Sequence, residues 1–391
     1  MMSDPVIVSA ARTAIGTARK GTLANTTGEE LAALVLNEVV RRSGLDADRF
    51  DDVIFAESGY GGGDLARYGA VVNGMLTVAG QALNRYCAGS LTAIGNGAAA
   101  IKSGMEQAIV AGGVQSSSMA PRMRQRVAGT ADEYADWHPS SHPNSVEAPN
   151  RDMSISVGWN TAKAAGLTRS QQDTWAFRSH QRAVAAIDAG KFVEEIFAIK
   201  VRGRDGELIE FAVDEHPRRD CTLETLASLK VLHPEIPGFS VTAGNASGVN
   251  AAAAAVALTS TELAASEGLT PMAKVLAWGA AGVDPALMGF GAQRAAEKVL
   301  ARAGKKTSDI ALWEINEAFA SVPVAACNEL GLDEERVNVN GSGCSLGHPV
   351  SASGARMVNT LIYELRRRGG GLGLATMCAG GGQGGALLLE V

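Results

Sequence analysis

Cys87 is the first residue of this sequence whose surroundings suggest chemistry. It stands in "NRYCAGSLTAIGNGAAAIKSG", residues 84–104, where an apolar lead-in gives way to a run of Gly, Ser and Ala that predicts a helix. A sulfur just ahead of a helix lies among unpaired backbone N–H groups and near the positive end of the helix dipole, which favour a thiolate. Cys87 is therefore a candidate nucleophile. The alternative is a plain buried cysteine, which behaves as a small hydrophobe.

Three further stretches carry polar or reactive residues: "EINEAFA" (314–320), "NGSGCSLGHPVSASGAR" (340–356) and "CAGGGQGG" (378–385). We expect each of them at the end of a strand. In open α/β sheets the ligand crevice lies beyond the carboxyl ends of the strands, so all three can converge there with Cys87. Each also has a structural interpretation: Asn316 as a helix cap, His348 as a turn residue and Cys378 as core.

The elements that must position these residues follow an α/β plan. Residues 5–11 and 51–58 are typical of short buried strands, and 26–44 between them predicts a helix with Thr26 or Thr27 as its cap and Gly44 after its end. This alternation predicts a parallel sheet covered by helices. Segments 299–318 and 351–377 repeat the pattern of the first half, which indicates two similar lobes that arose by duplication.

Between the lobes the sequence becomes polar and is broken by prolines. We expect an N-terminal lobe of residues 1–118 plus about 249–270, an inserted loop domain of 119–248, and a C-terminal lobe of 271–391. Long irregular segments in compact proteins commonly form lids or binding loops.

Bulk properties narrow the class of protein. The formal net charge of −6 over 391 residues argues against nucleic-acid binding, which usually needs a basic surface. The five cysteines contain no CxxC pair, which favours free thiols in a reducing compartment over disulfides or a zinc site. No signal peptide is apparent, and the apolar run 249–260 is too short to span a membrane. We therefore expect a cytoplasmic protein with no metal.

Taken together, the motifs resemble those of the thiolases along nearly the whole chain. The resemblance rests on blocks that occur in the family's order and at suitable separations: "VSAARTAIG", "NRYC", "VAGGV", "RSHQRA", "DEHPR", "TAGNASG", "EINEAFA", "NVNG…LGHP…ASGAR" and "CAGGGQG". It implies duplicated α/β lobes in five layers (α-β-α-β-α) with an inserted loop domain. It also implies reversible, ping-pong acyl transfer between acyl-CoA and acetyl-CoA, forming or cleaving a 3-oxoacyl-CoA.

The same resemblance assigns roles to residues. Cys87 would carry the acyl group as a thioester, His348 would accept the Cys87 proton, and Cys378 would act as second acid/base at the α-carbon of acetyl-CoA. Asn316 would hold a water that, with His348, stabilises the enolate oxygen. The backbone N–H groups of Cys87 and Gly380 would form a second oxyanion hole.

The resemblance also covers binding and assembly. Ser247 would contact the pantetheine arm of coenzyme A and Arg218 would lie near its nucleotide. Coenzyme A is then substrate and product, with no cofactor, and a homodimer or homotetramer is expected. Arg122, Arg124 and Arg126 are candidates for further phosphate contacts, although a solvated basic loop explains them as well.

The sequence departs from the family pattern at several points. The family usually has Cys-x-Ser-Gly after the nucleophile, whereas this chain has Cys87-Ala88-Gly89-Ser90; Cys344 and Ser345 are added close to His348; and the usual Asp-Gly after Asn250 is missing. The loop 129–160 also lacks the "HMG"-type stretch that borders the acyl pocket in short-chain members. The sequence therefore does not determine the acyl chain of the substrate: a longer or branched 3-ketoacyl chain is an alternative to that of acetoacetyl-CoA.

Two other functions fit the same fold. A decarboxylating condensing synthase pairs one cysteine with His/His or His/Asn, and the combination of Cys378 with Asn316 speaks against it. A non-catalytic binder of CoA or acyl groups on a decayed scaffold is the other, and the intact set of Cys87, Asn316, His348 and Cys378 speaks against decay.

Overall fold

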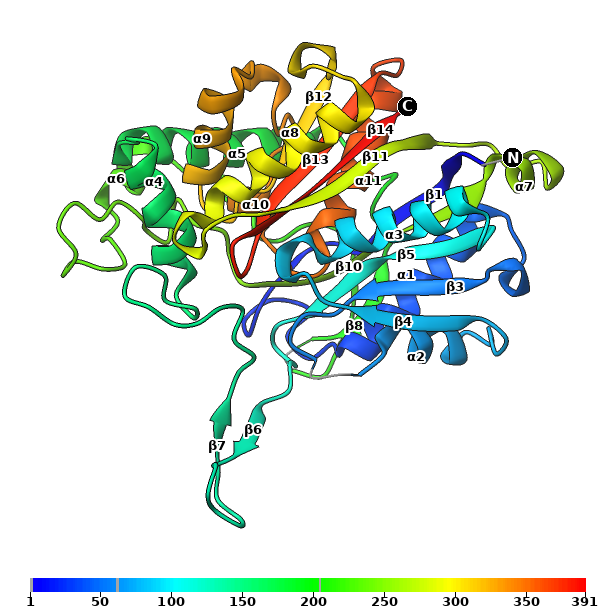
Figure 1. The fold of residues 1–391 in the computed structure, drawn as a ribbon, viewed down its shortest axis with the longest axis horizontal. Helices are drawn as coiled ribbons and strands as arrows, with labels where there is room; N and C mark the ends of the chain where they lie inside the picture. Colours follow the sequence, from blue (N-terminus) through cyan, green and yellow to red (C-terminus); the bar gives the residue numbers. More distant parts are fainter. Residues whose placement is uncertain (1–2, 61–62, 204) are drawn as a thin grey trace.

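A mixed β-sheet forms the frame of the molecule (Figure 1). The computed structural model describes residues 3–60, 63–203 and 205–391. The strands follow the order β12-β13-β14-β11-β1-β10-β5-β3-β4, with β2 beside β10. Their bounds are β1 Pro5–Arg12, β2 Gly16–Thr17, β3 Asp52–Ala56, β4 Ala79–Leu83, β5 Ala108–Ser116, β10 Asn250–Ser260, β11 Ala273–Gly282, β12 Leu312–Ile315, β13 Leu372–Ala379 and β14 Gln383–Glu390.

The expectation of a parallel sheet is wrong for most of it. β3 runs parallel to β4 and β5, and β12 runs parallel to β13, whereas the described pairings of β1, β2, β10, β11 and β14 are antiparallel. The helical crossovers that the sequence pattern reveals occur only toward the outer edges. The strands at the centre of the sheet pair in antiparallel fashion, and antiparallel pairs do not require a helical crossover.

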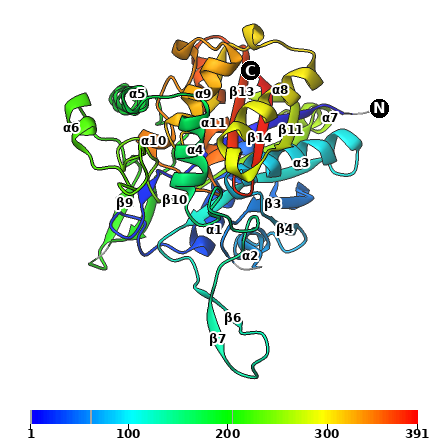
Figure 2. The same ribbon diagram turned by 60° about the vertical axis from the view of Figure 1, so that its left-hand side comes forward.

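The helices divide the molecule into five layers, as the fold class predicted (Figures 1 and 2). α3 and α11 contact strands of both halves of the sheet and form the central layer, while α1 with α2 and α8 with α9 form the outer layers. The two halves join where β1 pairs with β11. The bounds are α1 Gly28–Ser43, α2 Leu65–Val72, α3 Gly89–Ser103, α4 Asn160–Ala164, α5 Arg169–Asp188, α6 Leu223–Ser228, α7 Thr261–Ser266, α8 Gly291–Ala303, α9 Ser321–Leu330, α10 Gly343–Leu346 and α11 Ser353–Arg367.

Helix α1 begins and ends as its sequence predicts. Thr27, the second of the two candidate caps, accepts a hydrogen bond from the Glu30 N–H, and the Glu30 carboxylate accepts one from the Thr27 N–H. Gly44 ends the helix in a left-handed conformation (φ 74°), which glycine adopts without steric cost. The buried face of the helix includes Leu31, Val35 and Val39.

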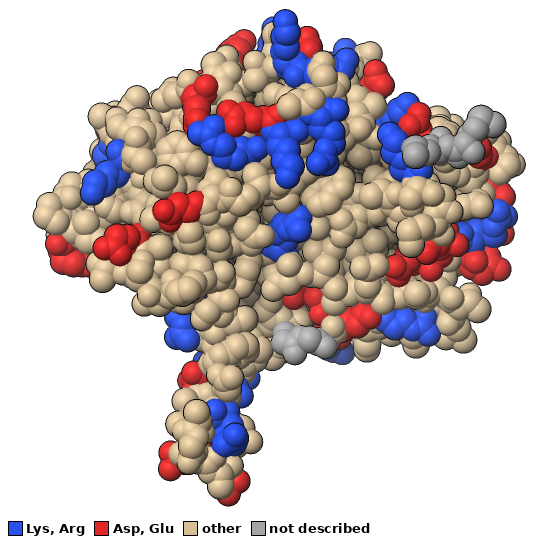
Figure 3. All heavy atoms as spheres, in the orientation of Figure 1, with Lys and Arg blue, Asp and Glu red and all other residues tan. Residues whose placement is uncertain are grey.

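The segment between the lobes contains α4, α5, α6 and two small hairpins, β6 Met123–Arg126 with β7 Tyr134–Trp137, and β8 Ile199–Arg202 with β9 Leu208–Phe211. The β6–β7 hairpin projects away from the body (Figures 1 and 2) and carries both basic and acidic side chains (Figure 3). Arg124 and Arg126 lie on this hairpin and are exposed, as a solvated basic loop predicts. In the described part of the chain, no helix is both long and apolar enough to cross a membrane.

A buried ion cluster ties this segment to the sheet. The fully buried Arg12 at the end of β1 pairs with Glu195 (2.7 Å) and in bidentate fashion with Asp214 (2.8 Å). The two carboxylates outweigh the effect of burial and raise the pKa of Arg12. Because a charge left alone in such a place is costly, the cluster fixes how the segment meets β1.

Candidate active site

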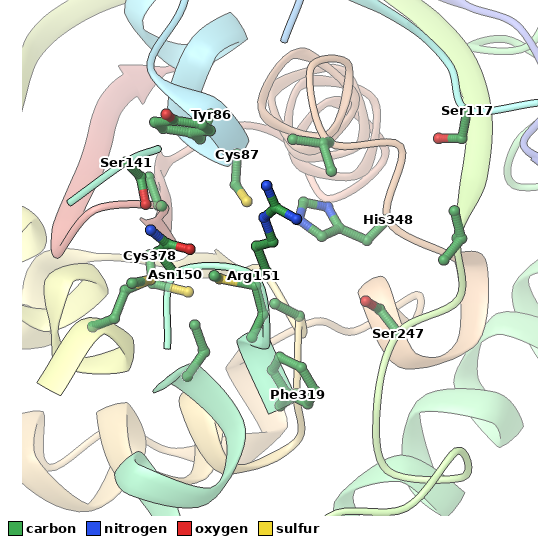
Figure 4. Close-up of a pocket in the computed structure, with 18 of the residues that line it drawn as sticks. Tyr86, Cys87, Ser117, Ser141, Asn150, Arg151, Ser247, Phe319, His348 and Cys378 are labelled. Carbon is green, nitrogen blue, oxygen red and sulfur yellow. The ribbon is translucent and has the colours of Figure 1, made fainter. Parts of the chain in front are cut away.

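A cavity of about 410 Å³ brings most of the sequence-predicted residues together (Figure 4). Cys87, His348, Cys378, Gly380 and Ser247 all line it. They come from separate parts of the fold: the turn before α3, the loop between α10 and α11, the end of β13 and the segment before β10. Most of the remaining wall is apolar and includes Tyr86, Met153, Val157, Met288, Phe319 and Val350.

Cys87 lies on a sharp turn directly ahead of α3, as its sequence context predicts. The preceding Tyr86 has φ 46°, an uncommon conformation for a residue with a side chain, and such strain concentrates at functional sites. Burial raises the pKa of Cys87 to about 11, while the backbone N–H groups of Cys87 and Gly380 act in the opposite direction. The resting residue is therefore a thiol, with two backbone donors directed at its sulfur.

Cys378 closes β13, and its side chain is buried among Val157, Met288 and Ala318. Burial, together with the charge that Cys87 can carry, raises its pKa well above the ordinary range for a thiol. The two sulfurs thus face one cavity and influence each other's ionisation. Gly380 follows closely, and a Cβ atom there would lie 2.9 Å from the Tyr86 ring, so the approach of β13 to the Cys87 turn requires glycine.

His348 is buried, and its ring orientation is determined by its neighbours. Nδ1 lies 2.6 Å from Ser353 Oγ, which donates its own proton to the Pro349 carbonyl at 2.9 Å. Nδ1 must therefore carry the ring proton, and Nε2 is the ring's acceptor and base. Burial and the charge of Arg356 lower the pKa of His348 to about 4, so the ring is neutral at pH 7.

Asn316 follows β12 and is fully buried. It is not the cap of the next helix, because α9 begins at Ser321 with Ala320 at its cap. Its Nδ2 lies 3.4 Å from His348 Nε2 and 3.5 Å from Nδ1, and its Oδ1 has no hydrogen-bond partner among the described residues. An unpaired buried oxygen beside a histidine fits a site that a bound water completes.

The expectation that each reactive stretch follows a strand is right for Asn316 and Cys378 and wrong for His348. His348 lies on a loop after the short helix α10, and Asn250 holds this loop by accepting the His348 N–H at 3.0 Å. Val249 also forms a bridge with His348. The sequence pattern of glycines there reflects tight turns rather than the end of a strand.

The two residues expected to contact coenzyme A are placed differently. Ser247 lines the cavity and donates its N–H to the Ala318 carbonyl at 2.9 Å. Arg218 is exposed outside the cavity lining, on a segment whose His216 lies against Gly248. The Arg218 N–H donates to His180 Nδ1 at 3.1 Å.

Three of the departures from the family pattern can be located in the structure. Ser90 is fully buried, and its Oγ accepts the N–H of Ala355 in the first turn of α11 at 3.0 Å. Cys344 is buried beside Glu317 and Asn245 and is not among the residues that line the cavity. The loop 129–160 does border the cavity, through Pro139, Ser141, Asn150, Arg151, Met153 and Val157.

Sequence reasoning missed two contributors. Ser353 belongs to the motif "SASGAR", but its contact with His348 depends on where α11 begins in the folded chain. Arg151 lies in a polar loop without periodicity, and its place in the cavity wall depends on how that loop folds back. In the parts of the chain outside residues 1–2, 61–62 and 204, no group of three or more His, Cys, Asp or Glu could hold a metal ion.

Comparison with known proteins identifies this arrangement. The family model for the N-terminal domain of thiolase matches residues 5–262, and that for the C-terminal domain matches residues 269–391. The chain belongs to the thiolase family. This thiolase is 42% identical to an acetyl-CoA acetyltransferase of Pseudomonas aeruginosa, with 99% of each chain covered. It is 39% identical to a 3-oxoadipyl-CoA/3-oxo-5,6-dehydrosuberyl-CoA thiolase of Escherichia coli, with 100% of each covered.

The fold of this thiolase is also that of a solved relative. The crystal structure of the Bacillus anthracis acetyl-CoA acetyltransferase matches with a TM-score of 0.89 and 37% identity, covering 100% of this chain and 99% of the other. Because the likeness extends over both lobes and the segment between them, the chain is an acyltransferase of the thiolase type.

Proposed function

We propose that this thiolase transfers acyl groups through Cys87, with His348 and Cys378 as the two acid/base groups. In the first half-reaction the Cys87 proton passes to His348 Nε2 while the sulfur attacks the acyl carbonyl. The S–C bond to coenzyme A then breaks, and the departing thiolate takes the proton from His348. A thiol suits this step because exchange between two thioesters is nearly isoenergetic, so the acyl-enzyme stays easy to discharge.

In the second half-reaction Cys378 handles a carbon-bound proton. In the synthetic direction its thiolate form removes a proton from the α-carbon of a bound acetyl-CoA, and the resulting carbanion attacks the acyl carbonyl. The bond from that carbonyl to the Cys87 sulfur then breaks, and the Cys87 thiolate takes up the proton that Cys378 removed. In the cleavage direction Cys378 donates its proton to the departing enolate. The burial that raises the pKa of Cys378 keeps it protonated at rest and makes its thiolate a strong base.

Two sets of donors stabilise negative charge on oxygen in this proposal. The N–H groups of Cys87 and Gly380, which already act on the Cys87 sulfur, would receive the oxyanion of the tetrahedral intermediate. His348 and a water on the unpaired Oδ1 of Asn316 would hold the enolate oxygen. Removing one donor of this kind typically costs on the order of 100- to 1,000-fold in rate.

Coenzyme A would enter from the side of Ser247, with its pantetheine arm along Ser247 and its nucleotide toward Arg218. The position of Ser247 in the cavity wall supports the first contact. Relatives named for acetyl-CoA and for 3-oxoadipyl-CoA are similarly close, so their names leave the acyl chain of this enzyme open. We also propose a cytoplasmic homo-oligomer, with the three-part domain division given above.

The observation that carries this function is the meeting of Cys87, His348 and Cys378 in one cavity. The test is mass spectrometry of the intact protein after brief mixing with acetyl-CoA or with a 3-ketoacyl-CoA and free coenzyme A. We expect an acyl adduct on Cys87 that is absent in Cys87→Ala and present in the control Cys344→Ala. Binding of coenzyme A without any adduct would instead indicate a non-catalytic binder, and condensation that needs malonyl-CoA would indicate a decarboxylating synthase.

A further inference from the structure

The turn that carries Cys87 depends on a backbone conformation that its residue types do not favour. Tyr86 has φ 46°, in the left-handed region that residues with a side chain rarely adopt. Such a conformation persists only where surrounding contacts hold it. The backbone N–H of the next residue, Cys87, is one of the two donors directed at the sulfur. The direction of this donor therefore follows from the conformation of Tyr86.

The ring of Tyr86 also bears on the second donor. It lies against Gly380, whose N–H is the other group directed at the Cys87 sulfur, and a Cβ atom at Gly380 would be 2.9 Å from the ring. Tyr86 and Cys87 lie next to each other on one side of the cavity (Figure 4). The contacts that hold Tyr86 therefore affect both donors of this oxyanion hole.

Asn84 supplies the contact that holds the backbone of Tyr86. Its Oδ1 accepts the Tyr86 N–H at 2.8 Å, so the side chain takes the place of a backbone carbonyl in a tight turn. The same oxygen accepts the Ser58 hydroxyl at 2.8 Å. Asn84 itself is exposed just after β4, whereas Ser58 is buried. The acceptor is therefore held from the interior of the protein.

Ser58 in turn connects Asn84 to the loop that carries His348. The Ser58 N–H donates to Ser351 Oγ at 2.7 Å, and the Ser351 hydroxyl donates to Gln115 Oε1 at 3.0 Å. Ser58, Ser351 and Gln115 are all buried, so water competes little for these hydrogen bonds. One chain of hydrogen bonds thus joins the turn of the nucleophile to the loop of the base.

We propose that Asn84 is a positioning residue for acyl transfer. Anchored by Ser58, it holds Tyr86 in its left-handed conformation. The Cys87 N–H is thereby directed at the oxyanion of the tetrahedral intermediate, while Asn84 touches no reacting atom. This inference rests on the proposed function, which uses the Cys87 N–H as a donor but does not explain its direction.

The test separates the two oxyanion sites of the proposed function. Asn84→Leu removes the acceptor, and we expect the rate at which acetyl-CoA acetylates Cys87, measured by mass spectrometry of the intact protein, to fall roughly 10- to 100-fold. The enolate of acetyl-CoA is stabilised at His348 instead. Exchange of the α-protons of acetyl-CoA with deuterated water, measured by NMR once the enzyme is fully acetylated, should therefore remain at the rate of the unmodified enzyme.

Three further variants make the comparison specific. Asn84→Asp keeps an oxygen that can accept both hydrogen bonds and should retain most of the acetylation rate. Ser58→Ala removes only the anchor and should cause a smaller loss of the same kind. The matched control is Asn37→Leu, the same substitution at an exposed asparagine of α1 whose side chain donates to Asn73 at 3.2 Å, and it should leave both rates unchanged.

An undiminished acetylation rate in Asn84→Leu overturns the inference. Equal losses of acetylation and of α-proton exchange also overturn it, because they would indicate a general disturbance of the cavity, and so does an Asn84→Asp variant as slow as Asn84→Leu. Each of these outcomes leaves the thiolase chemistry in place. An unmodified enzyme that forms no adduct on Cys87 overturns the proposed function itself, and the inference with it.

Discussion

At the scale of single residues, the site depends on the ionisation state of His348. The Ser353 hydroxyl oxygen accepts a hydrogen bond from Nδ1–H and the hydroxyl donates to the Pro349 carbonyl, so Ser353 selects the tautomer with a basic Nε2. Burial then keeps the ring neutral by lowering its pKa to about 4. Ser353 touches no reacting atom in the proposed mechanism and is a positioning residue.

Replacing Ser353 tests this arrangement. We expect Ser353→Ala to lower kcat by roughly 10- to 100-fold, because the ring loses the partner that fixes its tautomer and orientation. Ser353→Thr keeps the hydroxyl and restores most of the rate. The measurement is the pH dependence of kcat for both variants. A uniform fall in kcat for Ala and Thr alike, with no change in the pH profile, would indicate a packing role only.

Because the pKa of Cys87 is raised, the rate of its alkylation should depend on pH. The thiolate reacts with iodoacetamide, and for a thiol with a pKa of about 11 the thiolate fraction grows about tenfold per pH unit between pH 7 and pH 10. Labelling of Cys87, followed by peptide mass spectrometry, should rise with that slope, and bound acyl-CoA should suppress it. A rate that is flat from pH 6 to pH 9 would mean a stable thiolate–imidazolium pair and contradict the prediction.

At the scale of elements, the contact between α3 and α11 sets the distance between nucleophile and base. Helix α11 has no side-chain cap of its own, since Ala352 stands at its cap position. Ser90, in the first turn of α3, supplies the missing hydrogen bond to the Ala355 N–H. Because Ser and Gly are exchanged after Cys87, a serine of α3 caps the N-terminus of α11.

Removing this cap should destabilise the central layer. We expect Ser90→Ala to lower the free energy of unfolding by about 1–2 kcal/mol, because it leaves a buried N–H without a partner. The matched control is Ser103→Ala at the exposed end of α3, whose effect should stay within about 0.5 kcal/mol. Urea unfolding followed by circular dichroism measures both. Equal values for the two variants would show that water replaces the Ser90 hydroxyl.

At the scale of the whole molecule, the edge strand β4 is the feature that bears on assembly. β4 ends the sheet beside α2, and Ala79, Gln81 and Ala82 are exposed (Figure 1). Large apolar side chains next to it are exposed as well: Tyr68, Val71, Val72 and Leu76. An open edge flanked by apolar side chains favours pairing with another copy of the chain.

A charge on this edge should therefore weaken association. We expect Ala82→Lys to shift the protein toward the monomer, because two copies paired along β4 would bring two like charges together. Ala265→Lys, on the exposed side of α7, is the control and should leave the mass unchanged. Light scattering after size-exclusion chromatography measures both. An unchanged oligomer in Ala82→Lys would place the interface elsewhere.

Local sequence determined much of this protein. The bounds of α1 follow from Thr27, Glu30 and Gly44, whose effects act within one helical turn. The predicted roles of Cys87, Asn316, His348 and Cys378 came from the resemblance of their motifs, taken together, to those of the thiolases. Short-range features of this kind can be predicted from a single sequence.

Only the tertiary structure decided the remaining features, because they depend on contacts between residues far apart in sequence. The antiparallel centre of the sheet, the cap that Ser90 provides for α11, the selection of the His348 tautomer by Ser353 and the entry of Arg151 into the cavity all arise where separate elements meet. Arg151 illustrates the reason most clearly: an arginine in an irregular loop has no periodicity to indicate which way it faces. That direction comes from His142 and Asn150, which fold the loop back over the cavity.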